Sequence, residues 1–214
     1  MRGIDLSHWN NVIDWDKVKA SGKEFCIIKA TEGTTYLDPT YKERKDKVRN
    51  AGMLLGVYHF ANSTNAVKEA EWFLSQVGEL KEGELVVLDY ENYKLSDPAS
   101  WCLAWLNHVE KALGFKPILY TYHGILKSYN WKKVSDNNNG LWSSRYGLQE
   151  QTPNLKYQPS NGSWSFRMMW QYCSKGIVPG IIGNVDLNTT DMSLNTLKKY
   201  GQPVCLHCPT HCPK

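Results

Sequence analysis

The sequence lacks any hydrophobic segment long enough to cross a membrane as a helix. No apolar run in the 214 residues approaches the roughly 18 residues that a span requires, and the mean hydropathy is −0.49. The N-terminus, MRGIDLSHWN, also has no apolar run of signal-peptide length and no small-residue cleavage site. We therefore expect no membrane insertion. We also expect retention in the producing cell, export without an N-terminal signal, or a signal already removed.

Several patterns that carry chemistry are missing as well. The chain has no glycine-rich phosphate loop, no nucleophile constellation of cysteine and histidine, and no stripe of lysine and arginine. Its 25 basic and 21 acidic residues give a net charge of +4, too little to argue for nucleic acid. The histidines of the body lack the i, i+4 pairing of zinc hydrolases. We therefore expect no nucleic-acid partner, no cofactor and no metal in the body of the chain.

Cysteine is sparse until the last ten residues. Cys26, Cys102 and Cys173 lie in strand-like or helix-like runs, where buried free thiols are expected. The body therefore corresponds to a fold without disulfides over residues 1–200, followed by a Cys/Pro-rich tail or linker stub over 201–214. In that tail, Cys205, Cys208 and Cys212 have spacing that suits zinc. A short tail rarely supplies the outer shell of such a site, so a disulfide, a linker or an unstructured tail is preferred.

Aromatic residues are abundant instead, with 9 Trp, 12 Tyr and 5 Phe. Such rings fill hydrophobic cores, but they also stack on the flat apolar faces of sugars. Trp72, Trp101 and Trp105 occur at positions typical of packed helix faces, so we assign these three to the core. For the remaining rings, the choice between the core and a sugar-binding site depends on the polar residues around them.

Strand and helix signals alternate over the first two thirds of the chain. Helical patterns cover 14–20, 40–50, 65–77 and 97–113, the last opening with Asp-Pro and ending at Gly114. After Ser143 the long helical patterns stop, and 144–166 has the composition of a long loop or a short hairpin. The pattern predicts an α/β fold with a parallel sheet, either open or closed into a barrel whose last third has lost its helices. Strand-like runs cover 4–6, 25–30, 53–60, 85–88, 118–121, 141–143, 168–172 and 185–187.

Acidic residues stand at the ends of several of these strand-like runs. Asp89 and Glu91 follow an apolar strand in VVLDYEN, while Asp5 and Asp186 lie in GIDLS and GNVDLN. Because side chains alternate along a strand, Asp89 and Glu91 should share one face, with Cα atoms about 6–7 Å apart, and Tyr90 should point away. Like charges so close retain a proton, which suits hydrolysis of a glycosidic bond. A single strand-end acid is more commonly a helix cap, but four together are difficult to explain as caps.

Six collinear motifs make the sequence resemble glycoside hydrolase family 25, the lysozymes of the N-acetylmuramidase type that are common in bacteriophage lysins. These motifs are GIDLSHWN, KATEGTTYLDP, GVYHF, LDYEN, WQY and VDLN, and they span roughly residues 2–200. The resemblance implies an irregular (β/α) barrel, TIM-like but with helices missing in the last third. It also implies peptidoglycan as substrate, cleaved at the β-1,4 bond between N-acetylmuramic acid and N-acetylglucosamine. For a phage-type lysin, the absent signal implies storage in the host cytoplasm before release to the cell wall.

The resemblance also implies roles for the four acids. Glu91 matches the general acid, and Asp89 matches the carboxylate that supports attack by the 2-acetamido group of the substrate. Asp5 and Asp186 match two further aspartates that position the substrate. The residues alone leave a direct nucleophile and an inverting water open as alternatives.

Other side chains are candidates for substrate contact. Tyr58 or His59 must face inward at the end of one strand, and the resemblance favours Tyr58. Glu32 either lines the groove or pairs with Lys29. Further candidates from later strand ends are Tyr120, Tyr122, Trp142 and Gln171.

Two other functions remain open at this stage. A non-catalytic module that binds cell walls would keep the rings without needing the acid. A metal-dependent wall amidase would release amines rather than reducing sugars. Both would act on the same polymer, so they differ from the muramidase in chemistry and not in target.

Overall fold

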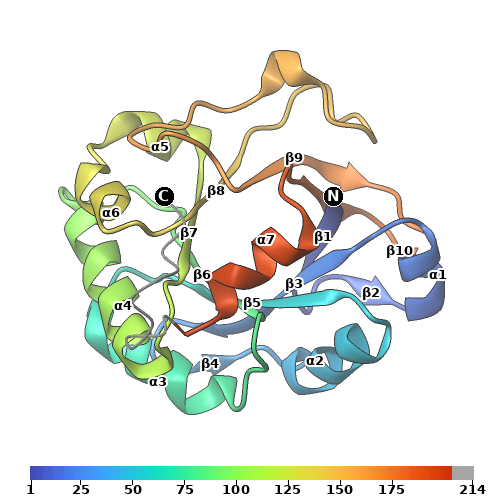
Figure 1. Ribbon diagram of the computed structural model, residues 1–214, viewed down its shortest axis with the longest axis horizontal. Coiled ribbons are helices and arrows are strands. Elements are labelled where there is room, and N and C mark those ends of the chain that lie inside the picture. The colour runs from blue at the N-terminus through green and yellow to red at the C-terminus, as the bar shows by residue number, and fades with distance from the viewer. Residues whose placement is uncertain (204–214) are drawn as a thin grey trace, which may run out of the picture.

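The sheet closes into a barrel because its two ends pair with each other. In the computed structural model, which describes residues 1–203, the hydrogen-bonded order is β1-β11-β9-β8-β7-β6-β5-β3, and β1 pairs again with β3 (Figure 1). The predicted α/β barrel is therefore confirmed, and the open sheet is excluded. The barrel strands are β1 (Arg2–Leu6), β3 (Phe25–Glu32), β5 (Leu54–Phe60), β6 (Leu85–Asp89), β7 (Ile118–Tyr122), β8 (Leu141–Ser144), β9 (Met169–Gly176) and β11 (Val185–Thr189).

One barrel strand runs opposite to the others. The strands from β1 to β9 pair in parallel, but β11 is antiparallel to both β9 and β1. The prediction of a parallel sheet is thus wrong for this strand. Only residues 177–184 separate β9 from β11, and a parallel crossover needs about a dozen residues or more. That short connection carries β10 (Ile181–Ile182), which pairs with β2 (Asn11–Val12) in a separate ribbon, while β4 (Tyr36–Leu37) extends β3.

Three of the four predicted helices begin where a capping side chain accepts a backbone N–H group. Asp14, Asn65 and Asp97 each accept from the residue three positions on, and they cap α1 (Trp15–Ala20), α3 (Ala66–Val77) and α4 (Pro98–Leu113). Gly114 ends α4 with a left-handed φ of 79°. The remaining predicted helix is α2 (Tyr41–Asn50). Short elements that the sequence did not predict are α5 (His123–Ser128), α6 (Lys132–Asp136), α7 (Leu194–Lys198), η1 (Leu155–Tyr157) and η2 (Lys199–Gly201).

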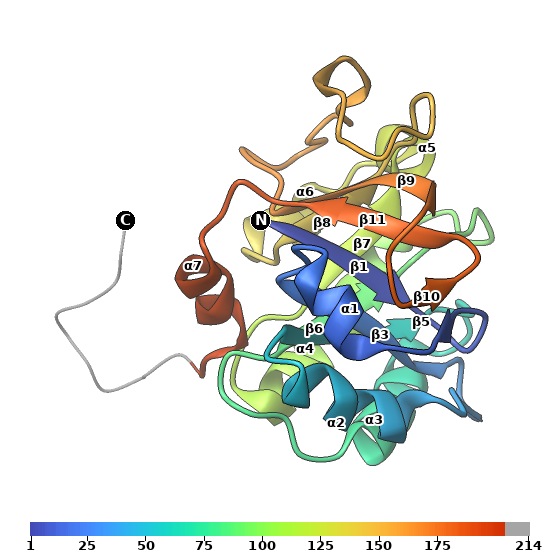
Figure 2. The same ribbon diagram turned by 90° about the vertical axis from the view of Figure 1, so that its right-hand side faces the viewer.

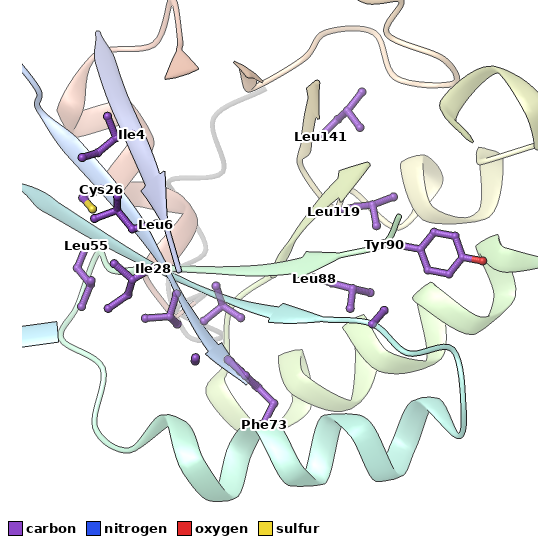
Figure 3. Packing of buried hydrophobic residues seen from close by; sticks show 14 of the residues in the cluster. Ile4, Leu6, Cys26, Ile28, Leu55, Phe73, Leu88, Tyr90, Leu119 and Leu141 are labelled. Atoms are coloured by element: carbon purple, nitrogen blue, oxygen red, sulfur yellow. The ribbon is translucent and has the colours of Figure 1, made fainter. Parts of the chain in front are cut away.

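The alternation of side chains along the strands builds two hydrophobic layers. In β3, Phe25 and Ile27 join a cluster inside the barrel, while Cys26 and Ile28 join the cluster between the barrel and its helices. Figure 3 shows members of this outer cluster, among them Ile28 and Phe73. Both faces of each strand are buried, which explains the nearly continuous apolar runs in the sequence. The three cysteines of the described chain, Cys26, Cys102 and Cys173, are buried and free, as predicted.

The amino end of the barrel is closed by the C-terminal helix. Leu197 of α7 is fully buried in the inner cluster, and Met192 and Tyr200 pack beside it. α7 lies across the middle of the strands in Figure 1 and at the N-terminal side of the barrel in Figure 2. The interior is therefore accessible only at the opposite end, where the parallel strands finish. None of the helices described between residues 1 and 203 is both long and apolar enough to span a bilayer.

Candidate active site

A cavity of about 360 Å³ lies at the carboxyl ends of the parallel strands. In barrels of this type, ligands bind at this end of the strands. The cavity contains all four acids that the sequence singled out, together with one cation and several aromatic rings. Its lining residues are Asp5, Ser7, Trp9, Lys29, Glu32, Tyr58, Phe60, Asp89, Glu91, Tyr120, Trp142, Tyr146, Gln171 and Asp186.

Asp89 and Glu91 share the inner face of one strand end, as predicted. Leu85 and Val87 of β6 point into the barrel, so Asp89 does too, and Glu91 follows just beyond the strand. Tyr90 points the opposite way, toward the helices (Figure 3), and packs near Trp101 and Trp131 at ring-centroid distances of 6.1 Å each. Asp89 is 8% exposed, whereas Glu91 is only partly buried and lies nearer the opening.

Asp5 and Asp186 face each other across the pairing of β1 with β11. Asp186 is the second residue of β11 and not near its end, which differs from the strand-end position that the sequence suggested. It reaches the cavity because β11 is antiparallel, so its amino end lies beside the carboxyl ends of the other strands. Asp186 therefore lines the cavity, but for a different geometric reason than the one that the sequence suggested.

Burial and mutual repulsion hold protons on this group of carboxyls. Burial raises the pKa of Asp5 to about 6, and burial with the charges of Asp5 and Glu91 raises the pKa of Asp186 to about 8. Burial also raises the pKa of Asp89 well above its ordinary value and raises that of Glu91, while the Lys29 ammonium acts against both shifts. These shifts favour the protonated form of both carboxyls in the Asp89–Glu91 pair, and a carboxyl that holds its proton is what a general acid requires.

The raised pKa of Asp186 predicts a dependence of stability on pH. The folded protein binds this proton more tightly than the unfolded chain, so the free energy of unfolding should fall as pH rises from ~4 to ~8. Asp186→Asn mimics the protonated form, so it should remove part of this fall and stabilise the protein at pH ~8 by on the order of 2 kcal/mol. Denaturant unfolding across this pH range measures the effect. Asp136→Asn on exposed α6 is the control, and equal pH slopes for both variants would contradict the prediction.

Two amides orient Asp5 from the barrel wall. Gln171 Nε2 and Asn188 Nδ2 donate to Asp5 Oδ2 at 2.8 and 2.7 Å. Gln171 Oε1 accepts from the hydroxyls of Tyr120 and Tyr146 at 2.7 and 2.6 Å. Asn188 Oδ1 in turn accepts from the indole nitrogen of Trp142 at 3.0 Å. This network fixes one acid and several rings in a single arrangement before any substrate arrives.

Most of the other candidate residues lie in the cavity. Tyr58, Tyr120, Trp142 and Gln171 belong to the lining. Glu32 also lines the cavity. At the same time it pairs with Lys29, whose Nζ lies 2.6 Å from Glu32 Oε2, so lining the groove and pairing with Lys29 are both observed. His59 points outward, as expected if Tyr58 points inward. His59 is fully buried between Thr31 and Glu69 and stacks on Trp105 with ring centroids 5.4 Å apart.

Tyr122 does not line the cavity. It ends β7 and packs near the ring of Tyr93, with ring centroids 6.0 Å apart. Tyr122 packs against the cluster between the barrel and its helices, whereas Tyr120 belongs to the inner cluster. The lining of the cavity therefore gives no support to its predicted role in binding substrate.

Sequence reasoning missed several residues of the site. Tyr146 lies in the long loop after β8, where no strand periodicity indicates direction. Trp9 follows β1 in a short loop, and Asn188 sits behind Asp5 on β11. Two signals were available: Trp9 and Asn188 lie in or beside the GIDLSHWN and VDLN motifs. Within residues 1–203 no cluster of three or more metal-ligating side chains is found, and Cys205, Cys208 and Cys212 lie outside the described residues.

A barrel that gathers paired carboxyls and aromatic rings at its open end has the construction of a glycoside hydrolase. The sequence pattern of glycosyl hydrolases family 25 matches residues 4–181. Lysozyme M1 of Streptomyces globisporus is 30% identical over 210 residues, which cover 88% of this chain and 67% of that protein. Two solved structures resemble this chain in both fold and sequence. The bacterial lysozyme from Streptomyces coelicolor has a TM-score of 0.81 and 29% identity, over 94% of this chain and 96% of that one.

The second structure is a muramidase from Trichobolus zukalii, with a TM-score of 0.80 and 27% identity over 95% of this chain and 100% of that chain. The chain belongs to glycosyl hydrolases family 25. It is accordingly a glycoside hydrolase of the lysozyme type, a peptidoglycan hydrolase built on a TIM-like barrel.

Proposed function

We propose that the protein cleaves the β-1,4 bond between N-acetylmuramic acid and N-acetylglucosamine in peptidoglycan, with Glu91 as the general acid. The observation that carries this proposal is the placement of Asp89 and Glu91 on one inner face at the open end of the barrel. Glu91 lies nearer the opening, where its proton can reach the oxygen of the leaving sugar. Asp89 lies deeper, where it can act on the sugar that remains bound.

Asp89 has an oxygen suited to the acetamido group of that sugar. Its Oδ1 is buried and has no hydrogen-bond partner among the described residues. A buried oxygen without a partner is costly unless a ligand satisfies it. An acetamido N–H would do so, and a negative Asp89 would stabilise the positive charge that develops on the acetamido carbon. Burial and the charge of Glu91 raise the pKa of Asp89, and the Lys29 ammonium opposes this rise and so acts toward the negative form.

The proposed reaction uses the Glu91 carboxyl twice, first as an acid and then as a base. The acetamido oxygen attacks the anomeric carbon while Glu91 transfers its proton to the leaving oxygen, so the glycosidic bond breaks and a cyclic oxazolinium forms. The Glu91 carboxylate then takes a proton from water as the water opens this ring. The product regains a free reducing end with retained configuration, and Glu91 regains its proton.

Product analysis on a defined peptidoglycan tests the bond and the mechanism. Mass spectrometry should find fragments with N-acetylmuramic acid at the reducing end, and early NMR spectra should show the retained anomer. Reducing ends on N-acetylglucosamine would contradict the proposed bond, while inverted or 1,6-anhydro products would contradict substrate assistance. Released amines with loss of activity in a chelator would favour the amidase instead, and binding without new reducing ends would favour the wall-binding module.

A further inference from the structure

Glu91 lies in an irregular segment, beyond the regular pairing of its strand. The last register pair between β6 and β7 is Asp89 with Tyr120, and β6 ends at Asp89. The Tyr90 N–H donates to the Tyr120 carbonyl at 2.9 Å, which fixes the chain just before Glu91. The ladder of the sheet ends there, so the chain on the other side of the proposed acid needs another support.

Asn92 provides that support through its side chain. Its Nδ2 donates to Ser63 Oγ at 2.7 Å, and the Ser63 hydroxyl donates back to Asn92 Oδ1 at 3.0 Å. Asn92 Oδ1 also accepts from the Lys94 N–H at 3.1 Å, and Asn92 Nδ2 lies 3.4 Å from the Ala61 carbonyl. The residue that follows Glu91 is therefore tied to the loop after β5. We call the pair of Ser63 and Asn92 the clamp.

Ser63 has a backbone conformation that suits glycine better than serine. Its φ is 58°, in the left-handed region, where the Cβ of an L-residue is crowded. Such a conformation persists only where the surrounding contacts enforce it. Glycine would adopt this φ more easily, so the turn itself does not require a serine. What serine adds at this position is the hydroxyl that holds Asn92.

Glu69 enforces the turn at Ser63 from the first turn of α3, where it is fully buried. It accepts backbone N–H groups on both sides of Ser63, from Asn62 at 3.0 Å and from Thr64 at 2.8 Å. The Thr64 hydroxyl lies 2.7 Å from the same carboxyl group, and His59 Nε2 lies 3.0 Å from it. Burial raises the pKa of Glu69, but these hydrogen bonds outweigh it and hold the pKa below its ordinary value. Glu69 thus acts as a buried carboxylate that fixes the loop around Ser63.

We propose that the clamp, braced by Glu69, positions Glu91 for proton transfer to the leaving sugar. The proposal rests on the proposed function, since it takes Glu91 as the general acid. In the part of the chain that the structure describes, the lining of the catalytic cavity includes neither member of the clamp, nor Glu69. These side chains therefore act on the reaction through Glu91, as positioning residues. A displacement of about 1 Å in a catalytic group can cost about 10²-fold in rate.

A substrate that needs no acid tests this directly. The 2,4-dinitrophenyl β-glycoside of GlcNAc-MurNAc has a leaving group that departs without a proton, whereas the leaving sugar of a glycan strand needs one. Ser63→Gly should lower kcat/KM on glycan strands about 10–100-fold and leave kcat/KM on the dinitrophenyl glycoside within about twofold. Glycine accepts the left-handed φ, so this variant should fold. Asn92→Ala should show the same contrast, and initial rates on both substrates measure it.

Asn138→Gly is the matched control. Asn138 also has a left-handed φ, of 59°, but it precedes β8 at the opposite end of the barrel. This control should leave the rates on both substrates unchanged. The double variant Ser63→Gly/Asn92→Ala should lose no more than either single variant, because both changes remove the same contact. In the Glu91→Gln background, Ser63→Gly should change the glycan rate by less than about twofold, because no acidic proton is left to position.

Equal losses on the two substrates in Ser63→Gly, or an unchanged glycan rate, would overturn the clamp as a positioning device. A full further loss when Ser63→Gly is added to Glu91→Gln would do the same. Glu91→Gln alone separates the two proposals, since it should slow the glycan and spare the dinitrophenyl glycoside. If it does not, the assignment of Glu91 and the clamp both fail. If it does while Ser63→Gly and Asn92→Ala slow neither substrate, the clamp alone fails.

Discussion

Glu91→Gln is expected to lower kcat by about 10²–10⁴-fold while leaving the folded structure intact. Glutamine keeps the shape of the side chain but has no acidic proton, so the leaving oxygen must depart as an alkoxide or take its proton from water. Because burial raises the pKa of Glu91, the ionised form is unfavourable in the folded protein. The neutral glutamine should therefore unfold at the same temperature as the wild type or at a higher one.

Release of reducing ends from purified cell walls measures the activity, and thermal unfolding measures the fold. The variant should still bind glycan strands, since only the acidic proton is removed, and a binding measurement therefore separates loss of chemistry from loss of binding. Clearing of cell walls at the wild-type rate by a correctly folded Glu91→Gln protein would reject Glu91 as the acid.

Asp89→Asn is expected to lower kcat by about 10²–10³-fold, with a small effect on KM. Asparagine cannot carry the negative charge that stabilises the oxazolinium, and its amide nitrogen would oppose the acetamido N–H. The pair would also lose one of its two coupled ionisations, so the pH profile of kcat/KM should lose the contribution of Asp89 and keep those of Glu91, Asp5 and Asp186. Initial rates on soluble glycan strands across the pH range measure both effects.

A control variant distinguishes a catalytic role of Asp89 from a purely structural one. Asp97→Ala removes the capping side chain from the exposed N-terminus of α4, so it should cost stability and leave kcat unchanged. Asp89→Asn should do the reverse, since the change removes a buried acid whose pKa is raised. An unchanged kcat in Asp89→Asn, or a loss that parallels a fall in the unfolding temperature, would contradict its assignment.

The sequence predicted the parts of the fold that depend on local patterns. Asp14, Asn65 and Asp97 marked helix starts correctly because a cap is a contact within four residues. The alternation in VVLDYEN placed Asp89 and Glu91 inward and Tyr90 outward because the strand geometry determines side-chain direction. The pairing of strands in a barrel is not local. The pattern of strands and helices alone therefore does not distinguish a closed barrel from an open sheet. The pairing of β1 with both β3 and β11 establishes that the barrel is closed.

The parts that were missed depend on contacts between distant segments. The direction of β11 follows from the length of the connection before it, and Tyr146 reaches Gln171 from a loop without periodicity. Helices α5, α6 and α7 have five or six residues each, too short for an apolar stripe to emerge. Trp9 was overlooked because nothing in its immediate neighbours shows that Arg44 and Asp38 hold its loop at the cavity.

The pairing of the first barrel strand with the last has a consequence for biosynthesis. The Met1 ammonium donates to the Thr190 carbonyl at 2.7 Å, across 189 positions of sequence, and Asp5 sits opposite Asp186. Contacts of such long range form late, after the segments between them have folded. While the chain emerges from the ribosome, β1 has no partner on its outer edge, and two of the four acids are kept apart. A nascent chain that stops short of β11 lacks the closed barrel, so synthesis itself delays the appearance of an activity aimed at cell walls until β11 has been translated.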